Sequence, residues 1–247
     1  MNFFSLFKRN ILYKIKKKIN IDSDNLNINS LDDLFHFYGS DKANIFKKTQ
    51  KKGHGFSTIY TQNLNHLKEK KIKILEIGSY AGSSAAAFAK YFRNSSIYCF
   101  DINISKFIFS SKNIHVYGLD INNQKKLEKT LENINLKSKS NFFDIIIDDG
   151  SHYLSDILLT LNTLFKYVKK GGFYIIEDFK HPNYYEYNRN INHILIDQVL
   201  NNLKEKKLFN SSIIKNDDQI YLNNNISKIS TYKGNLKDSD ICFIEKI

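Results

Sequence analysis

The stretch KIKILEIGSYAGSSAAAFAKYF, residues 71–92, decides the fold. An apolar run ends at Ile77, Gly78 and Gly82 bracket a tight turn, and residues 83–92 have the alanine-rich composition of a helix. Glycines at such a turn let the backbone approach a ligand closely, and the following helix presents free N–H groups. The stretch therefore predicts a strand, a ligand-binding turn and a helix at one edge of a sheet.

Short apolar runs and helical stretches alternate along the rest of the chain. The expected strands are 72–77, 96–101, 114–119, 142–147 and 172–176, and the expected helices are 83–92, 123–134 and 154–168. This alternation is typical of βαβ units, in which helices cover both faces of a parallel sheet. A helix at 191–207 and strand-like segments at 226–233 and 240–247 follow. We therefore expect an α/β fold with a doubly wound, mostly parallel sheet, a terminal antiparallel hairpin and an N-terminal helical appendage.

The N-terminal segment, residues 1–70, is expected to form an appendage to a main domain at residues 71–247. Residues 1–19 place apolar and basic side chains at the spacing of a basic amphipathic helix. We favour docking of this helix on its own domain or on a second subunit, and peripheral membrane contact remains an open alternative. A short helix at Leu31–Tyr38 and a polar segment at 39–70 follow, and we expect the polar segment to be a loop that becomes ordered over a site.

Composition narrows the class of protein. The chain has 247 residues, 42% of them hydrophobic, and a net charge of +12. Cys99 and Cys242 lie in apolar runs and cannot form a disulfide framework, and the sequence shows neither a membrane span nor a continuous apolar signal peptide. We expect a cytoplasmic protein, with association with the inner membrane surface left open. The positive charge favours anionic partners such as nucleotide diphosphates, acidic lipids or nucleic acid, but the bias toward Asn, Ile and Lys weakens that inference.

The residues around the glycine turn indicate what kind of ligand binds there. The spacing is G-x-x-x-G rather than the G-x-G-x-x-G of dinucleotide sites, and the acidic residue Glu76 precedes the first glycine. A cationic ligand with an amino group and a sulfonium suits this edge better than a pyrophosphate. Asp101 ends the next strand and is expected at the ribose hydroxyls, while Asp120 closes the third strand and is expected near the adenine. Each acid alone is more often a helix cap or a loop carboxylate, but three at successive strand ends favour a site.

The fourth and fifth strands end in DIIIDDGSH, residues 144–152, and GGFYIIEDF, residues 171–179. Their acidic residues should meet in one crevice, where they repel one another unless a cation holds them. We assign Asp149, Glu177 and Asp178 as ligands of a hard divalent ion, Mg²⁺ first, with Mn²⁺ or Ca²⁺ as alternatives. His152 is then the expected general base, although a histidine just before a helix is by itself more often structural.

These motifs, with YGSDK at 38–42, HGF at 54–56, FDIN at 100–103 and GLD at 118–120, extend over roughly residues 36–180. Together they resemble the metal-dependent sugar O-methyltransferases of the mycinamicin type, within the class I S-adenosylmethionine methyltransferases, which have a Rossmann-like fold. The resemblance implies S-adenosylmethionine and a divalent metal as cofactors and a sugar hydroxyl as acceptor. It matches Asp149, Glu177 and Asp178 to metal ligands and His152 to the base, and it suggests that the GSDK and HG segments form a loop over the active site.

The residues of the glycine turn, the positive charge and the resemblance together give the expected cofactor site and partners. The expected cofactor-binding residues are Glu76, Gly78, Tyr80, Gly82, Ser83, Asp101, Asp120 and Asp148. The expected acceptor is a nucleotide-activated sugar or a surface glycan precursor of polysaccharide biosynthesis, acted on by a homo-oligomer without nucleic acid. Phe56 replaces the usual Tyr, and the basic N-terminus and residues 181–225 also depart from the family, which leaves the acceptor open. The alternatives are a methyltransferase of a small phenolic or of RNA, and a non-catalytic scaffold. The absence of an RNA-binding module argues against RNA, and the costly cluster of charges argues against a scaffold.

Overall fold

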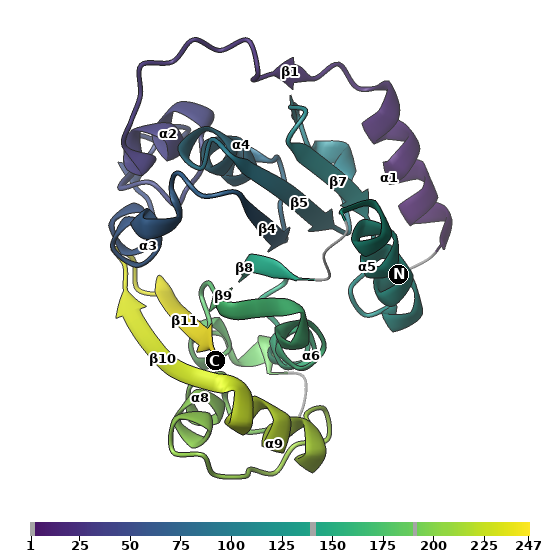
Figure 1. Cartoon of the computed structure of the whole chain (residues 1–247), viewed down its shortest axis with the longest axis vertical. Helices are drawn as coiled ribbons and strands as arrows, with labels where there is room; N and C mark the ends of the chain where they lie inside the picture. The colour runs from purple at the N-terminus through teal and green to yellow at the C-terminus, as the bar shows by residue number, and fades with distance from the viewer. Residues whose placement is uncertain (1–2, 139–141, 190–191) are drawn as a thin grey trace.

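A seven-stranded sheet forms the centre of the computed structural model, which describes residues 3–138, 142–189 and 192–247 (Figure 1). The strand order is β10-β11-β9-β8-β4-β5-β7, in which the pairs β10–β11 and β11–β9 are antiparallel and the other neighbouring pairs are parallel. The strands are β4 (Ile72–Ile77), β5 (Ser95–Asp101), β7 (Ile114–Gly118), β8 (Phe143–Asp148), β9 (Val168–Ile176), β10 (Ile226–Lys233) and β11 (Asp240–Lys246). The predicted fold class is confirmed, including the terminal hairpin.

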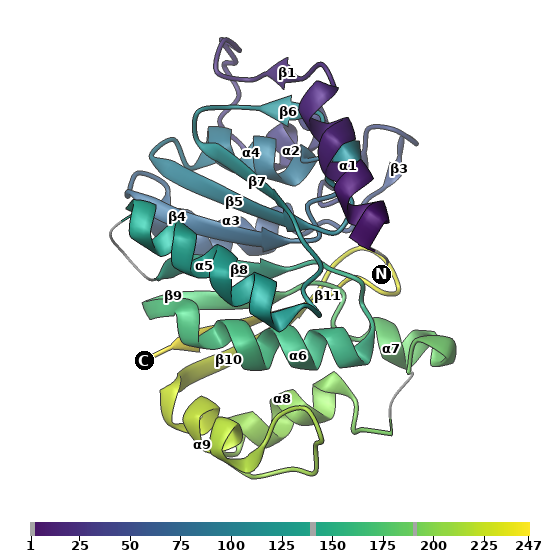
Figure 2. The ribbon, with the colours of Figure 1, turned by 90° about the vertical axis from the view of Figure 1, so that its right-hand side faces the viewer.

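Helices cover both faces of the sheet, which is why its strands are almost continuously apolar (Figure 2). Successive residues of β4 face opposite sides: Ile74 packs with α2 (Leu31–Tyr38), α3 (Ser57–Leu64) and α4 (Ser83–Tyr91), whereas Leu75 packs with the opposite layer. That layer contains α5 (Gln124–Ser138), α6 (Leu154–Leu164) and α8 (Ile196–Lys204). The chain order reverses at β4, which lies between β5 and β8, so a crevice is expected at the carboxyl ends of these strands.

The structure departs from the predicted elements at several boundaries. Helix α3 lies within the segment that we expected to be a loop, because STIYTQNL has no clear apolar periodicity although half of its residues are buried. Strand β9 begins at Val168 rather than at residue 172, and α6 ends at Leu164 rather than at residue 168. Helix α8 is shorter than the predicted 191–207, whose first residue lies outside the described part. Helix α9 (Asn216–Asn225) was not predicted, since its polar sequence has no apolar stripe.

Several short elements complete the described chain. They are the strands β1 (Ile19–Asn20), β2 (Ile45–Phe46), β3 (Lys51–Lys52) and β6 (Phe109–Ser110), the helix α7 (His181–Tyr184), and the 3₁₀ turns η1 (Asn65–Leu67), η2 (Ile104–Lys106), η3 (Phe165–Tyr167) and η4 (Glu186–Asn188). None of the described helices is long and apolar enough to cross a membrane.

The N-terminal helix α1 (Phe3–Ile15) docks on its own domain, against η2 and β7 (Figures 1 and 2). The Arg9 guanidinium donates to the carbonyl of Ile102 at 3.1 Å, and the Tyr13 ring packs edge-on against Phe107. The docked face is therefore not the apolar stripe that the sequence predicted, because Phe4, Ile11 and Ile15 on that stripe are exposed.

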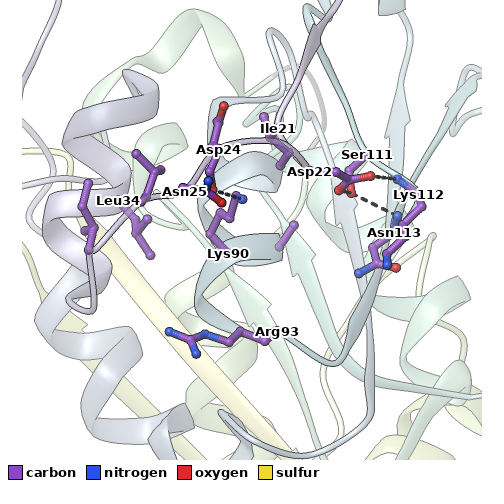
Figure 3. Close-up of a pocket in the computed structure, with 13 residues that line it drawn as sticks. Ile21, Asp22, Asp24, Asn25, Leu34, Lys90, Arg93, Ser111, Lys112 and Asn113 are labelled. Carbon is purple, nitrogen blue, oxygen red and sulfur yellow. Dashed lines mark hydrogen bonds between the residues drawn. The ribbon is translucent and has the colours of Figure 1, made fainter.

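The connector after α1 crosses the amino ends of β5 and β7. Asp22 accepts hydrogen bonds from the Ser111 hydroxyl at 2.6 Å and the Lys112 amide at 2.9 Å, and the Lys90 ammonium donates to the carbonyl of Asp24. A cavity of ≈ 410 Å³ lies between this connector and α4 (Figure 3). Its lining includes Asn113, just before β7, so it lies at the edge of the sheet opposite the strand ends that carry the predicted site.

Candidate active site

The glycine turn after β4 brings the tips of two strands together. Gly78 has φ +83°, and a Cβ at this position would overlap the carbonyl oxygen of Asp149 and lie only 2.8 Å from Cα of Gly150. Glycine is thus required by contact with the protein's own backbone after β8, in addition to the ligand approach that the sequence suggested. Gly82, with φ +81°, packs on the Phe107 ring and lies at the N-cap of α4.

Two cavities meet at this turn. The first, of ≈ 180 Å³, is lined by apolar side chains such as Phe100 and Leu119 and by Asp101 and Asp120. The second, of ≈ 550 Å³, is lined by residues of the turn and by the GSDK segment. Gly78, Asp101 and Gly150 line both, so the cavities adjoin along the carboxyl edge of the sheet. Five of the predicted cofactor contacts line them: Gly78, Tyr80, Ser83, Asp101 and Asp120.

Asp101 is fixed by the backbone around it. Its carboxylate accepts hydrogen bonds from the amide of Tyr80 at 2.7 Å and from the amide of Asn103 at 2.5 Å. The Tyr80 backbone has φ +41°, which is costly for a residue with a side chain, and its ring is exposed. The turn therefore holds Asp101 at the boundary between the two cavities, where its remaining lone pairs can accept hydrogen bonds from a ligand.

Glu76, Gly82 and Asp148 line neither cavity. Glu76 is fully buried, burial raises its pKa, and neither of its carboxylate oxygens has a hydrogen-bond partner among the described residues. Asp148 faces the protein interior, where it accepts hydrogen bonds from the hydroxyls of Thr160 and Tyr174. Burial raises the pKa of Asp148 to about 6. The Asp148 carboxylate thus anchors the strand end to α6 and β9, and its role as a cofactor contact stays a prediction.

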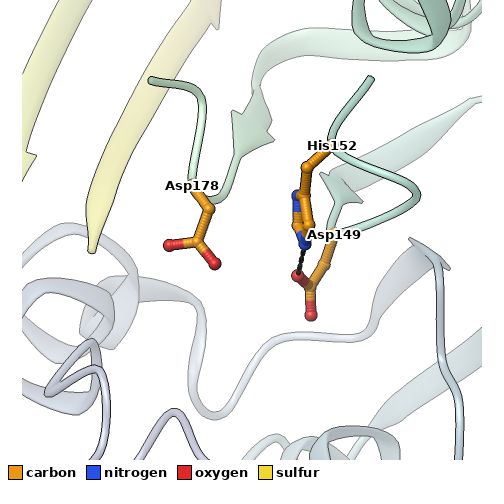
Figure 4. Close-up of side chains that lie close together, drawn as sticks. All are labelled: Asp149, His152 and Asp178. Carbon is orange, nitrogen blue, oxygen red and sulfur yellow. Dashed lines mark ion pairs between the residues drawn. The ribbon is translucent and has the colours of Figure 1, made fainter. Parts of the chain in front are cut away.

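Asp149, His152 and Asp178 come together at the tips of β8 and β9 (Figure 4). One ligand atom from each lies within 4.8 Å of the others, and His152 Nε2 is 3.7 Å from Asp149 Oδ1. His152 and Asp178 both have positive φ, at +57° and +49°. Such strained backbone is concentrated at functional sites, where the surrounding structure holds it in place. The structure thus brings together three of the four residues that the sequence assigned to metal binding and catalysis.

Glu177, the fourth of these residues, lies beside them and is paired with a lysine. The Lys42 ammonium lies 2.5 Å from Asp149 Oδ2 and 2.5 Å from Glu177 Oε2, and the Tyr60 hydroxyl donates to the other oxygen of Glu177. Burial opposes the charge on Lys42, but Asp149 and Glu177 raise its pKa well above the ordinary value. Burial also raises the pKa of Glu177, to about 8. Lys42 is therefore a cation that holds two of the clustered carboxylates, and sequence reasoning gave it no role.

His54 approaches the cluster from the other side. Its Nδ1 is 2.9 Å from the Ser239 hydroxyl and 3.3 Å from Asp178 Oδ1. Burial opposes its charge, but Asp178 raises the pKa of His54 to about 9. The motifs GSDK and HGF were the signal for Lys42 and His54, while Tyr60 follows shortly after HGF on the unpredicted helix α3. His181 also lies here, its ring 5.3 Å from that of His152.

Comparison with known proteins agrees with this geometry. Residues 75–179 match a family described as a methyltransferase domain. A rhamnosyl tetracenomycin-C 2'-O-methyltransferase from Streptomyces olivaceus is 27% identical over 58% of this chain and 36% of its own length. A mycinamicin VI 2''-O-methyltransferase from Micromonospora griseorubida is 28% identical over 51% of this chain and 31% of its own length. The match thus spans only about a third of the length of each of these relatives.

Solved structures show the same fold. One of them is the MycE methyltransferase of the mycinamycin pathway, solved with Mg, SAH and mycinamycin VI. The match covers 89% of this chain and 55% of the MycE chain, with a TM-score of 0.68 and 22% sequence identity. The resemblance inferred from the motifs is confirmed. Residues 75–179 match a methyltransferase domain, the structure has the class I fold, and the chain is similar to sugar O-methyltransferases.

Proposed function

We propose that this protein is an S-adenosylmethionine- and divalent-metal-dependent O-methyltransferase that acts on a sugar hydroxyl. The observation that carries the proposal is the convergence of Asp149, His152 and Asp178 beside the two adjoining cavities, at the carboxyl edge of the sheet where the chain order reverses. A bound sulfonium cofactor supplies the methyl group, and curated relatives are named as methyltransferases of sugar-bearing compounds.

The cavities suit this cofactor. The smaller one is lined by apolar side chains together with Asp101 and Asp120, which fits an adenine and its ribose hydroxyls. Glu76 lies two residues before Gly78 and has two buried carboxylate oxygens without a hydrogen-bond partner among the described residues. A buried carboxyl group of this kind favours a ligand nearby that carries a hydrogen-bond donor or a positive charge, because a buried polar group without a hydrogen-bond partner is costly.

The metal site would be formed by Asp149, Glu177 and Asp178. Asp149 and Glu177 already converge on one cation, the Lys42 ammonium, and Asp178 Oδ1 lies 3.3 Å from Nδ1 of His54. These oxygen donors fit a hard ion such as Mg²⁺. When bound, the ion would lower the pKa of the acceptor hydroxyl and stabilise the negative charge on its oxygen.

His152 would remove the proton from the acceptor hydroxyl. Its Nε2 faces Asp149, and imidazole accepts protons near neutral pH. The deprotonated oxygen would then be the nucleophile toward the methyl group that a sulfonium cofactor would supply, with the electron pair of the carbon–sulfur bond left on sulfur. Most of the acceleration would come from alignment, since fixing two reactants in place removes much of the entropic barrier.

The acceptor is proposed to be a nucleotide-activated sugar or a glycan precursor in cytoplasmic polysaccharide biosynthesis, and the protein a homo-oligomer. The net charge of +12 favours an anionic acceptor. The direct test is incubation with methyl-labelled S-adenosylmethionine and a panel of nucleotide sugars.

The assignment of His152 is tested by His152→Ala, with His36→Ala on α2 as a matched histidine outside the site. We expect His152→Ala to lose methyl transfer while its affinity for S-adenosylhomocysteine stays close to that of the wild type. EDTA should abolish transfer, and Mg²⁺ should restore it. Normal transfer by His152→Ala would exclude this residue as the base, and full activity without metal would exclude the metal site.

A further inference from the structure

The outward face of α1 is apolar, which is unusual for a surface helix. Phe4 is 75% exposed, Ile15 is 74% exposed, and Phe7 and Ile11 lie between them on the same side of the helix. The inner face, by contrast, uses Asn10 and Tyr13 and the Arg9 guanidinium to contact the domain. A helix docked through its more polar side exposes its apolar stripe to the surroundings of the protein.

Basic side chains border this apolar stripe. Lys8, Lys14 and Lys17 are all exposed, and no acidic residue precedes Asp22 in the sequence. An apolar face bordered by lysines is the pattern of helices that lie in the headgroup region of a bilayer, with the apolar side chains buried and the ammonium groups at the anionic headgroups. A second copy of the same face would bring lysines against lysines across a two-fold axis, which opposes self-association.

The helix also lies beside the proposed cofactor site. Arg9 is bonded to the carbonyl of Ile102, and Ile102 lines the smaller cavity directly after Asp101. Both views show α1 beside β7, whose C-terminal end is at the same edge of the sheet (Figures 1 and 2). A surface that contacted the outer face of α1 would therefore be close to the carboxyl edge of the sheet.

We infer that α1 is a membrane-surface anchor, whose Phe4–Phe7–Ile11–Ile15 face inserts into an anionic lipid headgroup layer. The anchor would hold the carboxyl edge of the sheet close to the bilayer, where a lipid-linked sugar acceptor would be presented. The acceptor part of this inference rests on the proposed function. The lipid contact does not, because it depends only on α1.

The test is co-sedimentation of the full chain with vesicles, which needs neither cofactor nor methyl transfer. Vesicles of phosphatidylcholine alone are compared with an equal mixture of phosphatidylcholine and phosphatidylglycerol, at low and high salt. The apolar variant combines Phe4→Ser, Ile11→Ser and Ile15→Ser, and the charge variant combines Lys8→Gln, Lys14→Gln and Lys17→Gln. The matched control combines Leu208→Ser and Ile220→Ser, two exposed apolar residues elsewhere on the surface.

We expect binding to the anionic vesicles only, weakened by salt. Each lost lysine should reduce partitioning about fivefold, so the charge variant should bind on the order of 10²-fold more weakly. The apolar variant should lose binding by a similar factor or more, and the control should bind like the wild type. Equal binding of the wild type and the apolar variant would overturn the inference. So would a dimer in light scattering that the apolar variant dissolves, because the face would then be a subunit interface.

Discussion

Replacing Gly78 with alanine tests whether the β4 turn sets the geometry of the site. The added Cβ would overlap the Asp149 carbonyl oxygen, and it would lie 2.6 Å from the carbonyl carbon and 2.8 Å from Cα of Gly150. These are backbone atoms, so the strand tips must separate. Gly171→Ala is the matched control, because Gly171 also has positive φ, at +70°, but has no atom within 4 Å of the added Cβ. Both substitutions carry the cost of a left-handed backbone with a Cβ, about 1–2 kcal/mol.

Both variants carry the backbone cost, but only Gly78→Ala displaces the backbone after β8. A difference in ligand affinity between them therefore reports the displacement of the site. A shift approaching 1 Å in a positioned group can cost about 10²-fold in function, so we expect Gly78→Ala to bind S-adenosylhomocysteine at least about tenfold more weakly. Gly171→Ala should bind it like the wild type. Isothermal titration calorimetry gives both affinities, and urea unfolding checks that each variant is folded. If Gly78→Ala keeps wild-type affinity, the contact between the β4 turn and the β8 tip does not position the ligand.

Three further substitutions probe the network around the site. Lys42→Met leaves the Asp149 and Glu177 carboxylates without their cation, so the free energy of unfolding in EDTA should fall by about 3–5 kcal/mol. Added Mg²⁺ should then stabilise this variant more than it stabilises the wild type. Lys246→Met is the control, a buried lysine that donates to backbone carbonyls, and an equal Mg²⁺ effect in both variants would contradict the idea. Tyr60→Phe removes the hydrogen bond to Glu177 and should cost about 1–3 kcal/mol in urea unfolding; no loss would mean that Glu177 is satisfied without it. The hydrogen bond from Ser111 lowers the pKa of Asp22, so its stabilisation is present above the unfolded pKa and is lost as pH falls through the folded value. In Asp22→Asn the free energy of unfolding should therefore decrease less as the pH is lowered than it does in the wild type. The same decrease in both proteins would show that this contact contributes nothing to stability.

The parallel core could be predicted from sequence because its signal is local and strong. Strand β4 was predicted with its observed bounds, since a strand buried on both faces is a continuous apolar run that stops at the glycine turn. Helix α3 gave no such signal, because its buried positions include Ser57 and Tyr60, whose burial depends on partners distant in sequence. The early start of β9 was missed for a similar reason, as Lys169 and Lys170 do not resemble a strand.

Helix α1 shows why amphipathic periodicity does not identify the face that docks. The sequence correctly placed an amphipathic helix there and favoured its docking on the domain, but it did not indicate that the more polar face is the one that docks. The domain surface that α1 contacts presents the carbonyl group of Ile102 and the Phe107 ring. Arg9 and Tyr13 match those groups better than an aliphatic stripe does.

The candidate site was predictable to the extent that strand ends determine it. Asp149, His152 and Asp178 were brought together by topology alone, because β8 and β9 are adjacent parallel strands. The clustered acids were also expected to need a cation, and a metal was the only cation expected. The structure supplies one such cation from the protein: Lys42 reaches Asp149 and Glu177 from a segment more than a hundred residues away in sequence.

That lysine changes what metal dependence should mean in this protein. A site held by metal alone would lose its shape when the ion leaves, because its carboxylates would repel one another. Here the Lys42 ammonium holds Asp149 and Glu177 together, and Nδ1 of His54 lies 3.3 Å from Asp178 Oδ1. The three proposed metal ligands therefore stay close to one another without an ion. A site organised in advance loses less conformational entropy on binding. Stability of the wild type should therefore depend only weakly on Mg²⁺ even though methyl transfer depends on it strongly.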